Sequence, residues 1–490
     1  MVLVWEGIVM ARMNRRHFIG ALGAGAAGLA VAGTAWGKAR KQPNIVFILA
    51  DDLGRHQVRC YGNPFYETPN LDAIAAQGVK FSNAYAACPV CSPTRASIMT
   101  GKYPARLHIT DYIPGNPYPY AKLKTPDWTK ELPPEEVTLA EMLKGAGYAT
   151  GHFGKWHLAR ENDARYTPGG NGFPETQGFD DVLVTAKPDS KETASAGANP
   201  DYDAHHARAI TDRAIAFIQS NKVRPFFCYI AHNLIHRPEM EYAPNIVKYA
   251  QKPEAGNEKG NNPVLGAMVE TLDSQIGRVL KALEELGLAD NTVVVFFSDN
   301  GDFYGRERRQ PFYGHKADLY EGGIRMPLII RWPGIVEAGS ESDALACSID
   351  FFPTFAEWAG VPIPKGRLDG VSLIPVLREG ARLERDTLFW HYPHYHSIGV
   401  GPSGAIRKGK YKLIEWFEKS IEHPMPDDAL ELYDLESDPG EQHNLAAIMP
   451  EKTRDLYTRL RAWRQWAGAQ EMERNPDYDP ARASAIASLI

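Results

Sequence analysis

The sequence is poor in three features, and each absence excludes a class of protein. Its 490 residues include five cysteines, too few for a chain of this length to depend on a disulfide framework. No apolar run reaches the roughly 20 residues of a membrane-spanning helix, and no repeated unit indicates a solenoid. Basic residues are outnumbered by acidic ones, 54 against 60, which argues against nucleic acid as a partner. What remains is an ordinary globular composition, which fits one large domain with an appendage or two to three smaller domains.

The first 41 residues differ from the rest of the chain. Arg15 and Arg16 precede an apolar run from Phe18 to Gly33 that is rich in Ala and Gly and short for a spanning helix. Paired arginines before such a run resemble a twin-arginine export signal. We therefore expect residues 1–41 to be a signal segment, the twin-arginine machinery to be a partner and the protein to be periplasmic. An uncleaved N-terminal anchor is the alternative.

Strands and helices alternate in the middle of the chain. Apolar runs at 44–50, 226–231 and 292–297 are typical of strands covered on both faces. Apolar residues recur every three or four positions over 210–218 and 265–283, which predicts helices. The alternation predicts a large α/β sheet, mixed but mostly parallel, with helices on both faces. In such sheets ligands bind beyond the carboxyl ends of the strands.

The pattern changes after about residue 375. Short strands are predicted at 387–390, 404–407, 411–414 and 431–435, followed by a helix over 450–466. We therefore expect a domain over residues 42–375 and a smaller α+β subdomain over 376–490, in which a helix packs on a short antiparallel sheet. Polar stretches near 160–176, 184–203 and 249–263 are predicted to be surface loops.

Oxygen-bearing side chains follow two of the central strands. Asp51 and Asp52 come after the first, and Asp299 and Asn300 after the third. Carboxylates that crowd together repel one another unless a cation lies between them, and oxygen ligands suit Ca²⁺ or Mg²⁺ better than a soft metal. The alternative is that each aspartate caps the following turn.

Cationic and imidazole side chains lie in three further segments. Lys155 and His157 are two residues apart, so on an extended segment both would point the same way and present two cations. His236 follows the strand at 226–231, and Lys316 lies in a glycine-rich segment whose backbone can approach closely.

The most distinctive segment runs from Cys91 to Gly101. Ser92 is predicted to be the N-cap of a helix, Pro93 its first residue and Gly101 its end. A thiol at the N-terminus of a helix is expected to have a lowered pKa, and Arg95 follows about one turn later. The segment therefore predicts a site that attracts an anion.

This segment, with its C-x-P-x-R pattern and a helix ending in Thr-Gly, resembles the modification signature of the type I sulfatases of the alkaline phosphatase superfamily. The Asp-Asp pair, Gly-Lys-Trp-His-Leu, the histidine after a strand, Ser-Asp-Asn-Gly and the lysine before Tyr-Glu-Gly-Gly match that family in order and spacing. Met99 stands where most members have Leu. The resemblance implies an alkaline-phosphatase-like fold, sulfuric ester hydrolase activity and a sulfatase catalytic domain over residues 42–375.

The resemblance also implies a role for each residue. Cys91 would be oxidised to formylglycine by dedicated machinery, and the hydrated aldehyde would attack sulfur. His236, aided by Lys316, would protonate the departing alcohol, and His157 would take a proton from the second hydroxyl. One Ca²⁺ would be held by the formylglycine oxygen, Asp51, Asp52, Asp299 and Asn300, while the aldehyde and sulfate would be bound by Arg95, Lys155 and Lys316.

The substrate is expected to be a sulfated carbohydrate. The segment Trp390–His396 gathers aromatic and histidine residues, which would stack on a sugar and bind its hydroxyls, and the loop 112–116 would form the opposite wall. These segments predict substrate binding by His391, His394, Tyr112 and Asn116, although a packed strand end is the alternative. The competing functions are a phosphodiesterase or phosphonate monoester hydrolase of the same superfamily, and a non-catalytic protein that binds sulfated glycans.

Overall fold

The computed structural model describes residues 42–256, 261–303, 311–363, 366, 368–421 and 428–487. The predicted signal segment at 1–41 lies outside these residues. Within the described ranges, no helix is both long enough and apolar enough to cross a membrane.

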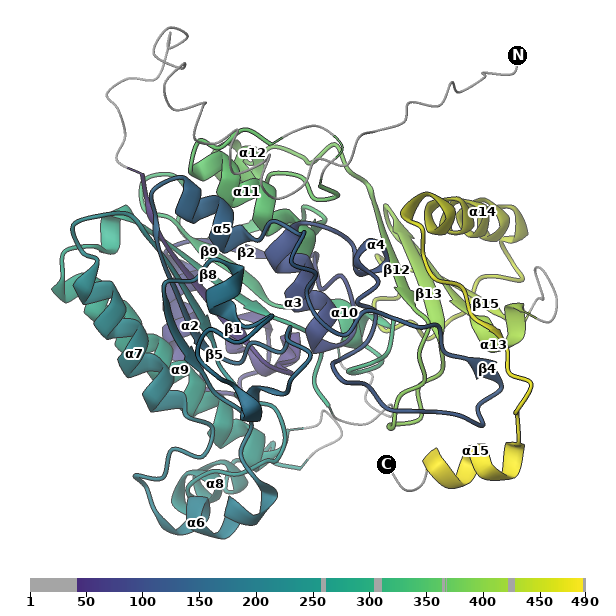
Figure 1. Cartoon of the computed structure of the whole chain (residues 1–490), viewed down its shortest axis with the longest axis horizontal. Coiled ribbons are helices and arrows are strands. Elements are labelled where there is room, and N and C mark those ends of the chain that lie inside the picture. Colours follow the sequence, from purple (N-terminus) through teal and green to yellow (C-terminus); the bar gives the residue numbers. More distant parts are fainter. Residues whose placement is uncertain are drawn as a thin grey trace, which may run out of the picture.

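One large sheet of eight strands organises the fold (Figure 1). Strands β8, β1, β7, β5 and β6 are neighbours and run parallel, whereas β9 is antiparallel to both β8 and β2. The prediction of a mixed, mostly parallel sheet is confirmed. In spatial order the strands are β10 (Ser340–Ser342), β2 (Val79–Phe81), β9 (Leu328–Arg331), β8 (Thr292–Ser298), β1 (Asn44–Ala50), β7 (Phe226–Ala231), β5 (Ala149–Gly154) and β6 (Asp181–Val184).

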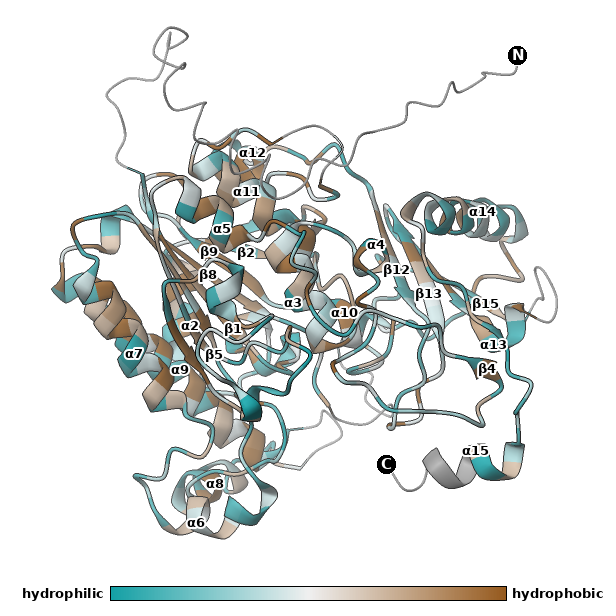
Figure 2. Cartoon of the chain, in the orientation of Figure 1, coloured by the Kyte–Doolittle hydropathy of each residue, from teal (hydrophilic) through white to brown (hydrophobic). Residues whose placement is uncertain are grey.

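Helices cover both faces of this sheet because its central strands are apolar on both. Phe47 and Leu49 pack on one side and Val46 and Ile48 on the other, and Figure 2 shows the central strands in the brown of apolar residues. The first face is covered by α3 (Cys91–Thr100), α5 (Leu139–Gly145), α11 (Phe351–Trp358) and α12 (Ile374–Glu379). The second is covered by α2 (Pro69–Ala76), α7 (Ala207–Ser220), α8 (Ala243–Ala250) and α9 (Pro263–Glu285).

A second, antiparallel sheet lies toward the C-terminus. Its apolar side chains pack beneath α14 (Pro450–Ala467), and Tyr85 of the preceding part of the chain joins the same core, with its ring 5.5 Å from that of Trp390. The predicted small sheet and its helix are confirmed, while the boundary at residue 375 stays a prediction. The strands are β12 (Thr387–Tyr392), β13 (Ser403–Lys408), β14 (Tyr411–Trp416) and β15 (Leu430–Asp434).

Shorter elements connect these layers. Two strand pairs join distant segments, β3 (Ala84–Tyr85) with β11 (Ala346–Cys347) and β4 (Leu123–Lys124) with β16 (Glu473–Arg474). The short helices are α4 (Pro104–Leu107), α6 (Thr193–Ala198), α10 (Glu321–Ile324), α13 (Phe417–Ser420) and α15 (Pro480–Ala487). The 3-10 turns are η1 (Arg55–Gln57), η2 (Arg59–Tyr61), η3 (Asp163–Arg165), η4 (Pro174–Gln177), η5 (Ser190–Glu192), η6 (Ala289–Asn291) and η7 (Ser348–Asp350).

All three stretches predicted to be surface loops contain helical turns. The stretch 160–176 contains η3 and reaches into η4. The stretch 184–203, predicted to be a loop, contains η5 and α6, because a capping box at Asp189 starts a short turn of helix there. The stretch 249–263 likewise reaches into α9, whose first residue is Pro263. All five cysteines are free thiols, so the expectation of a fold without disulfides is confirmed.

Candidate active site

The site lies at the carboxyl ends of four neighbouring parallel strands. Asp51 and Asp52 follow β1, Asp299 and Asn300 follow β8, Lys155 follows β5, and His236 comes five residues after β7. Since the order in the sheet is β8, β1, β7, β5, these strand ends meet at one edge.

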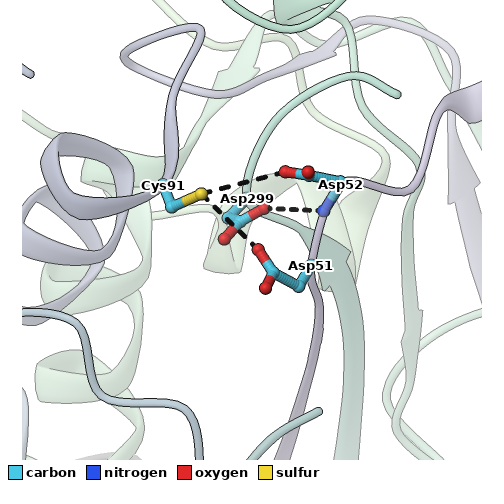
Figure 3. A group of neighbouring side chains, drawn as sticks. All are labelled: Asp51, Asp52, Cys91 and Asp299. Atoms are coloured by element: carbon cyan, nitrogen blue, oxygen red, sulfur yellow. Dashed lines mark hydrogen bonds between the residues drawn. The ribbon is translucent and has the colours of Figure 1, made fainter. Parts of the chain in front are cut away.

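Three carboxylates and one thiol form the centre of the site, which we call the carboxylate cluster: Asp51, Asp52, Asp299 and Cys91. Each contributes one atom to a group in which all atoms lie within 4.8 Å of one another, and all four residues are buried. The Cys91 Sγ is 3.5 Å from Asp51 Oδ1 and 3.8 Å from Asp52 Oδ1 (Figure 3). Helix α3 therefore aims its first side chain at the end of β1.

Three buried cations surround the carboxylate cluster. Arg95 donates from Nε and Nη2 to Asp299 Oδ2 at 2.9 and 2.7 Å. The Lys155 Nζ lies 2.9 and 2.7 Å from the two oxygens of Asp51. The Lys316 Nζ donates to Asp52 at 2.6 and 2.9 Å and lies 3.3 Å from Cys91 Sγ. The structure thus brings together residues that are 265 positions apart in the chain.

These charges set the protonation of the cluster. Burial opposes ionisation of Asp51, but the surrounding cations, Lys155 foremost, hold its pKa well below the usual value. Burial and the charge of Asp51 together raise the pKa of Asp299 to about 7 against the opposing effect of Arg95. The cations around the cluster therefore do not fully compensate the charge of Asp299, as expected where carboxylates crowd together.

Asn300 offers the clearest sign that the cluster is built to hold a cation. Its Nδ2 donates to Asp52 Oδ1 at 2.8 Å and to the Gly301 carbonyl at 2.9 Å, whereas its Oδ1 is buried without a hydrogen-bond partner. A buried acceptor without a donor is costly, and a metal ion beside it would remove that cost. Three carboxylates and an amide oxygen fit a hard divalent cation.

The start of α3 differs from its prediction in two ways. The helix begins at Cys91 with Val90 as its N-cap, and the Ser92 hydroxyl instead accepts a hydrogen bond from the Ile113 N–H at 3.0 Å. The Gly101 end is confirmed, since Gly101 is left-handed with φ of 67°. Burial raises the pKa of the Cys91 thiol to about 12, although Lys155 and Lys316 oppose it, so the expectation of a lowered pKa is wrong.

The prediction that Lys155 and His157 present two cations is also wrong. Burial and then the charge of Lys155 lower the pKa of His157 well below its usual value, so the ring is neutral at pH 7. Its Nε2 donates to the Ile113 carbonyl at 2.6 Å, which leaves Nδ1, buried and without a partner, as the acceptor nitrogen. His236 lies beside the carboxylate cluster. Its Nε2 is 3.7 Å from Asp52 Oδ2, and its Nδ1 is 2.7 Å from the Arg237 carbonyl.

Sequence reasoning missed a carboxylate that shapes this site. Asp163 accepts hydrogen bonds from the backbone N–H groups of Trp156 at 2.9 Å and His157 at 3.1 Å, and His157 has a φ of 59°. The carboxylate thereby stabilises a backbone conformation that is uncommon for a residue with a side chain. Asp163 stands in the stretch 160–176 that was predicted to be a surface loop, and only its position six residues after His157 hinted at this contact.

The predicted substrate residues fall into two groups. His391 and His394 are buried, with Nε2 hydrogen bonds to the Gln470 carbonyl at 2.8 Å and to the Thr110 hydroxyl at 2.8 Å. Both contacts favour a packing role, and substrate binding by these two histidines stays a prediction. Tyr112 and Asn116 are half-buried, and the Tyr112 ring lies 5.5 Å from that of His396, the last residue of the predicted sugar-binding segment Trp390–His396.

Comparison with known proteins identifies the family. The sulfatase family model matches residues 43–361. The chain belongs to the sulfatase family. A second model, that of the N-sulphoglucosamine sulphohydrolase C-terminal region, matches residues 312–465 of this sulfatase.

Several relatives match most of this sulfatase. Human arylsulfatase A is 33% identical over an alignment of 469 residues that covers 86% of this chain and 85% of its own. Human N-acetylgalactosamine-6-sulfatase is 33% identical over an alignment of 377 residues that covers 72% of this chain and 69% of its own. The solved structure of BT4656 in complex with its substrate D-glucosamine-2-N,6-O-disulfate has a TM-score of 0.68 and 26% identity, and covers 87% of this chain and 98% of that one. This sulfatase is thus a sulfuric ester hydrolase with an alkaline-phosphatase-like fold.

Proposed function

We propose that this sulfatase is exported and hydrolyses sulfate esters of carbohydrates, using a formylglycine made from Cys91 and one bound Ca²⁺. The observation that carries the proposal is the setting of Cys91. Its thiol faces two carboxylates and lies 3.3 Å from Lys316 Nζ, yet its pKa is raised to about 12. A thiol held protonated is a poor nucleophile, which supports a role for Cys91 as a precursor.

The cation would be held by the oxygens of Asp51, Asp52, Asp299, Asn300 and the modified residue 91. When bound, it would supply positive charge that polarises a sulfate oxygen and favours the ionised nucleophile. The partnerless Asn300 Oδ1 supports this ligand set.

Formylglycine would supply, as its hydrate, one hydroxyl that attacks sulfur and a second that allows sulfate to leave. Arg95 and Lys155 would fix residue 91 through the network that already ties Arg95 to the Lys155 carbonyl at 2.8 Å. Lys155 and Lys316 would bind sulfate oxygens. Their carboxylate partners keep both ammonium groups charged, because they raise the pKa of each lysine against the opposing effect of burial.

Two histidines would move protons in the two halves of the reaction. His236 donates from Nδ1 to the Arg237 carbonyl, so its Nε2 is the nitrogen that would carry a proton to the departing alcohol. Burial lowers the pKa of His236 to about 4, and the negative charge of a bound sulfate ester would raise it again. His157 has the opposite task, and its Nδ1 would accept the proton of the second hydroxyl.

Carbohydrate substrates are supported by the relatives, which include an N-acetylgalactosamine-6-sulfatase and a protein solved with a disulfated glucosamine. Export by the twin-arginine machinery rests on Arg15 and Arg16 in the sequence. Modification of Cys91 would require formylglycine-generating machinery in the producing cell. We retain the catalytic domain at 42–375 and the subdomain at 376–490 as parts of this proposal.

The test compares turnover of sulfate esters and phosphodiesters by one preparation made together with formylglycine-generating machinery. We expect sulfate esters to be cleaved faster, Cys91→Ala to abolish that cleavage, and Cys88→Ala, three residues away, to retain it. Faster phosphodiester cleavage would overturn the proposal in favour of a phosphodiesterase. Binding of sulfated glycans without release of sulfate by fully modified protein would instead support a non-catalytic role.

A further inference from the structure

A cavity of about 370 Å³ lies beside the loop 112–122 and is walled by three separate segments of the chain. The first wall is formed by residues of 118–122, the second by residues of 395–401, and the third by Tyr478, Pro480 and Ala483, while Glu418 completes the lining. We call the segment 473–483, which carries the third wall, the C-terminal strap. The volume is in the range of a small-molecule site.

The C-terminal strap is fixed to the first wall by backbone and side-chain contacts. Strand β16 pairs with β4, and the Asn475 side chain donates to the carbonyls of Pro119 and Ala121 at 2.9 and 2.8 Å. The Arg482 guanidinium lies over the Tyr120 ring, 3.3 Å from its centroid. Figure 1 shows α15, in yellow, below β4 and α13. The strap is thus a wall built from the far end of the chain.

The second wall is a tight turn. The His396 N–H donates to the Val400 carbonyl at 3.0 Å, and the Gly399 N–H donates to the His396 carbonyl at 3.0 Å. This turn fixes the position of His396 at the edge of the cavity.

The lining is aromatic with polar groups between the rings. Tyr118 and Tyr395 have ring centroids 5.7 Å apart, and the Tyr395 hydroxyl donates to Glu418 Oε1 at 2.6 Å. Tyr478 is 46% exposed, unusual for so large a ring. Rings offer apolar faces that pack against the C–H groups of a sugar, while Glu418 can accept hydrogen bonds from its hydroxyls.

His396 links this cavity to the catalytic centre. It lines the cavity, and its ring is 5.5 Å from that of Tyr112. Burial and the charge of Lys316 lower the pKa of His396 to about 3, with Asp52 acting in the opposite direction. Ile113, the next residue after Tyr112, is hydrogen-bonded to the Ser92 hydroxyl at 3.0 Å and to the His157 ring at 2.6 Å. The contact between His396 and Tyr112 therefore joins the cavity to the loop that packs on the catalytic residues.

We propose that this cavity binds a sugar ring of the same glycan chain that presents its sulfate to Cys91, so that the enzyme prefers oligosaccharides to monosaccharides. This inference rests on the proposed function. The C-terminal strap accounts for the preference for oligosaccharides, because it supplies Tyr478 to the cavity and holds Tyr120 in place.

Binding is the first test, because it does not depend on turnover. Heparin, chondroitin sulfate and carrageenan tetrasaccharides are titrated into the Cys91→Ala protein, each beside its sulfated monosaccharide. We expect at least one tetrasaccharide to bind about 10-fold more tightly than its monosaccharide, as for one well-packed aromatic contact. In Tyr478→Ala the tetrasaccharide and the monosaccharide should bind with about equal affinity. Tyr478→Phe, which retains the ring, should preserve the roughly 10-fold difference. Tyr202→Ala, which alters an exposed tyrosine of the α6 region, is the matched control and should change nothing.

Turnover by modified Cys91 protein separates this inference from the proposed function. The ratio of kcat/KM for the preferred tetrasaccharide to that for 4-nitrophenyl sulfate should fall about 10-fold in Tyr478→Ala. Equal binding of tetrasaccharides and monosaccharides, or a ratio that Tyr478→Ala leaves intact, would overturn the subsite alone. Absence of sulfate release from every ester, with tetrasaccharide binding still lost in Tyr478→Ala, would overturn the proposed function and leave the subsite standing.

Discussion

If the proposed Ca²⁺ is bound, its removal should lower the melting temperature of this sulfatase, and the size of the effect should depend on Asn300. A ligand that binds only the native state stabilises it by about 2.7 kcal/mol at 100 times its Kd. For a domain of 150–250 residues, 1 kcal/mol shifts Tm by about 2–4 °C, and the shift shrinks as the chain lengthens. For a chain of 490 residues we take about 1–2 °C per kcal/mol, and therefore expect Tm to fall by about 3–5 °C when Ca²⁺ is chelated.

The structure ties this shift to particular atoms. Asn300 Oδ1 is a buried oxygen without a partner, and its Nδ2 orients Asp52 at 2.8 Å. Asn300→Ala removes both the ligand oxygen and the hydrogen bond that orients Asp52. The Ca²⁺ concentration needed for half of the rise in Tm should therefore increase by about 10–100-fold. Asn291→Ala is the matched control, because Asn291 lies before β8, at the end of that strand opposite Asn300, and its side chain donates to the Gln42 carbonyl at 3.2 Å. This variant should respond to Ca²⁺ like the parent protein.

The assay is thermal melting at fixed pH in excess EGTA, followed by back-titration with Ca²⁺ or Mg²⁺. Ca²⁺ should restore Tm at a lower concentration than Mg²⁺, because four or more protein oxygens suit the larger ion. A Tm that is the same in EGTA and in excess Ca²⁺ would refute the assignment of this cluster as a cation site. An equal response of Asn300→Ala and Asn291→Ala would refute the role of Asn300.

Three further substitutions test the packing around the site. Gly154→Ala would put a Cβ 1.9 Å from the Ala231 carbonyl oxygen and should abolish soluble expression, whereas Gly147→Ala, also at positive φ but in open space, should cost about 1–2 kcal/mol and melt only slightly lower. Arg95→Met would leave Asp299 buried without its cation and should cost about 3–5 kcal/mol, measured as a fall in Tm that a second change, Asp299→Asn, partly reverses. Burial raises the pKa of Asp111 to about 7, above its unfolded value, so the stability that this carboxyl provides is full below about pH 4 and is lost as pH rises toward 7. Asp111→Asn should therefore be more stable than the parent at pH 8, by up to roughly 4 kcal/mol in the free energy of unfolding, and it should melt at a higher temperature there. At pH 4 it should show no such gain, and a stability gain that does not depend on pH would contradict this reasoning.

The strands could be predicted because burial on both faces leaves a plain mark in the sequence. The apolar runs at 44–50 and 226–231 coincide with β1 and β7, and parallel strands bring their carboxyl ends to one edge. The meeting of Asp51, Asp299 and Lys155 at that edge follows from the alternation of strands and helices.

Contacts between distant loops could not be predicted in the same way. Ser92 has every property of an N-cap, yet its hydroxyl accepts from Ile113 N–H, 21 residues away. The thiol pKa depends on burial, which a helix start does not reveal. The support of His157 by Asp163 and the packing of His391 against Gln470 are likewise tertiary contacts without a periodic signal.

The central claim is that residue 91 becomes the nucleophile only after oxidation. Mass spectrometry of the peptide that contains residue 91, from protein produced with formylglycine-generating machinery and assayed in parallel, tests it most directly. The account predicts an aldehyde in place of the thiol, in a fraction that rises in proportion to sulfate ester turnover. Intact Cys91 throughout a fully active preparation would contradict it.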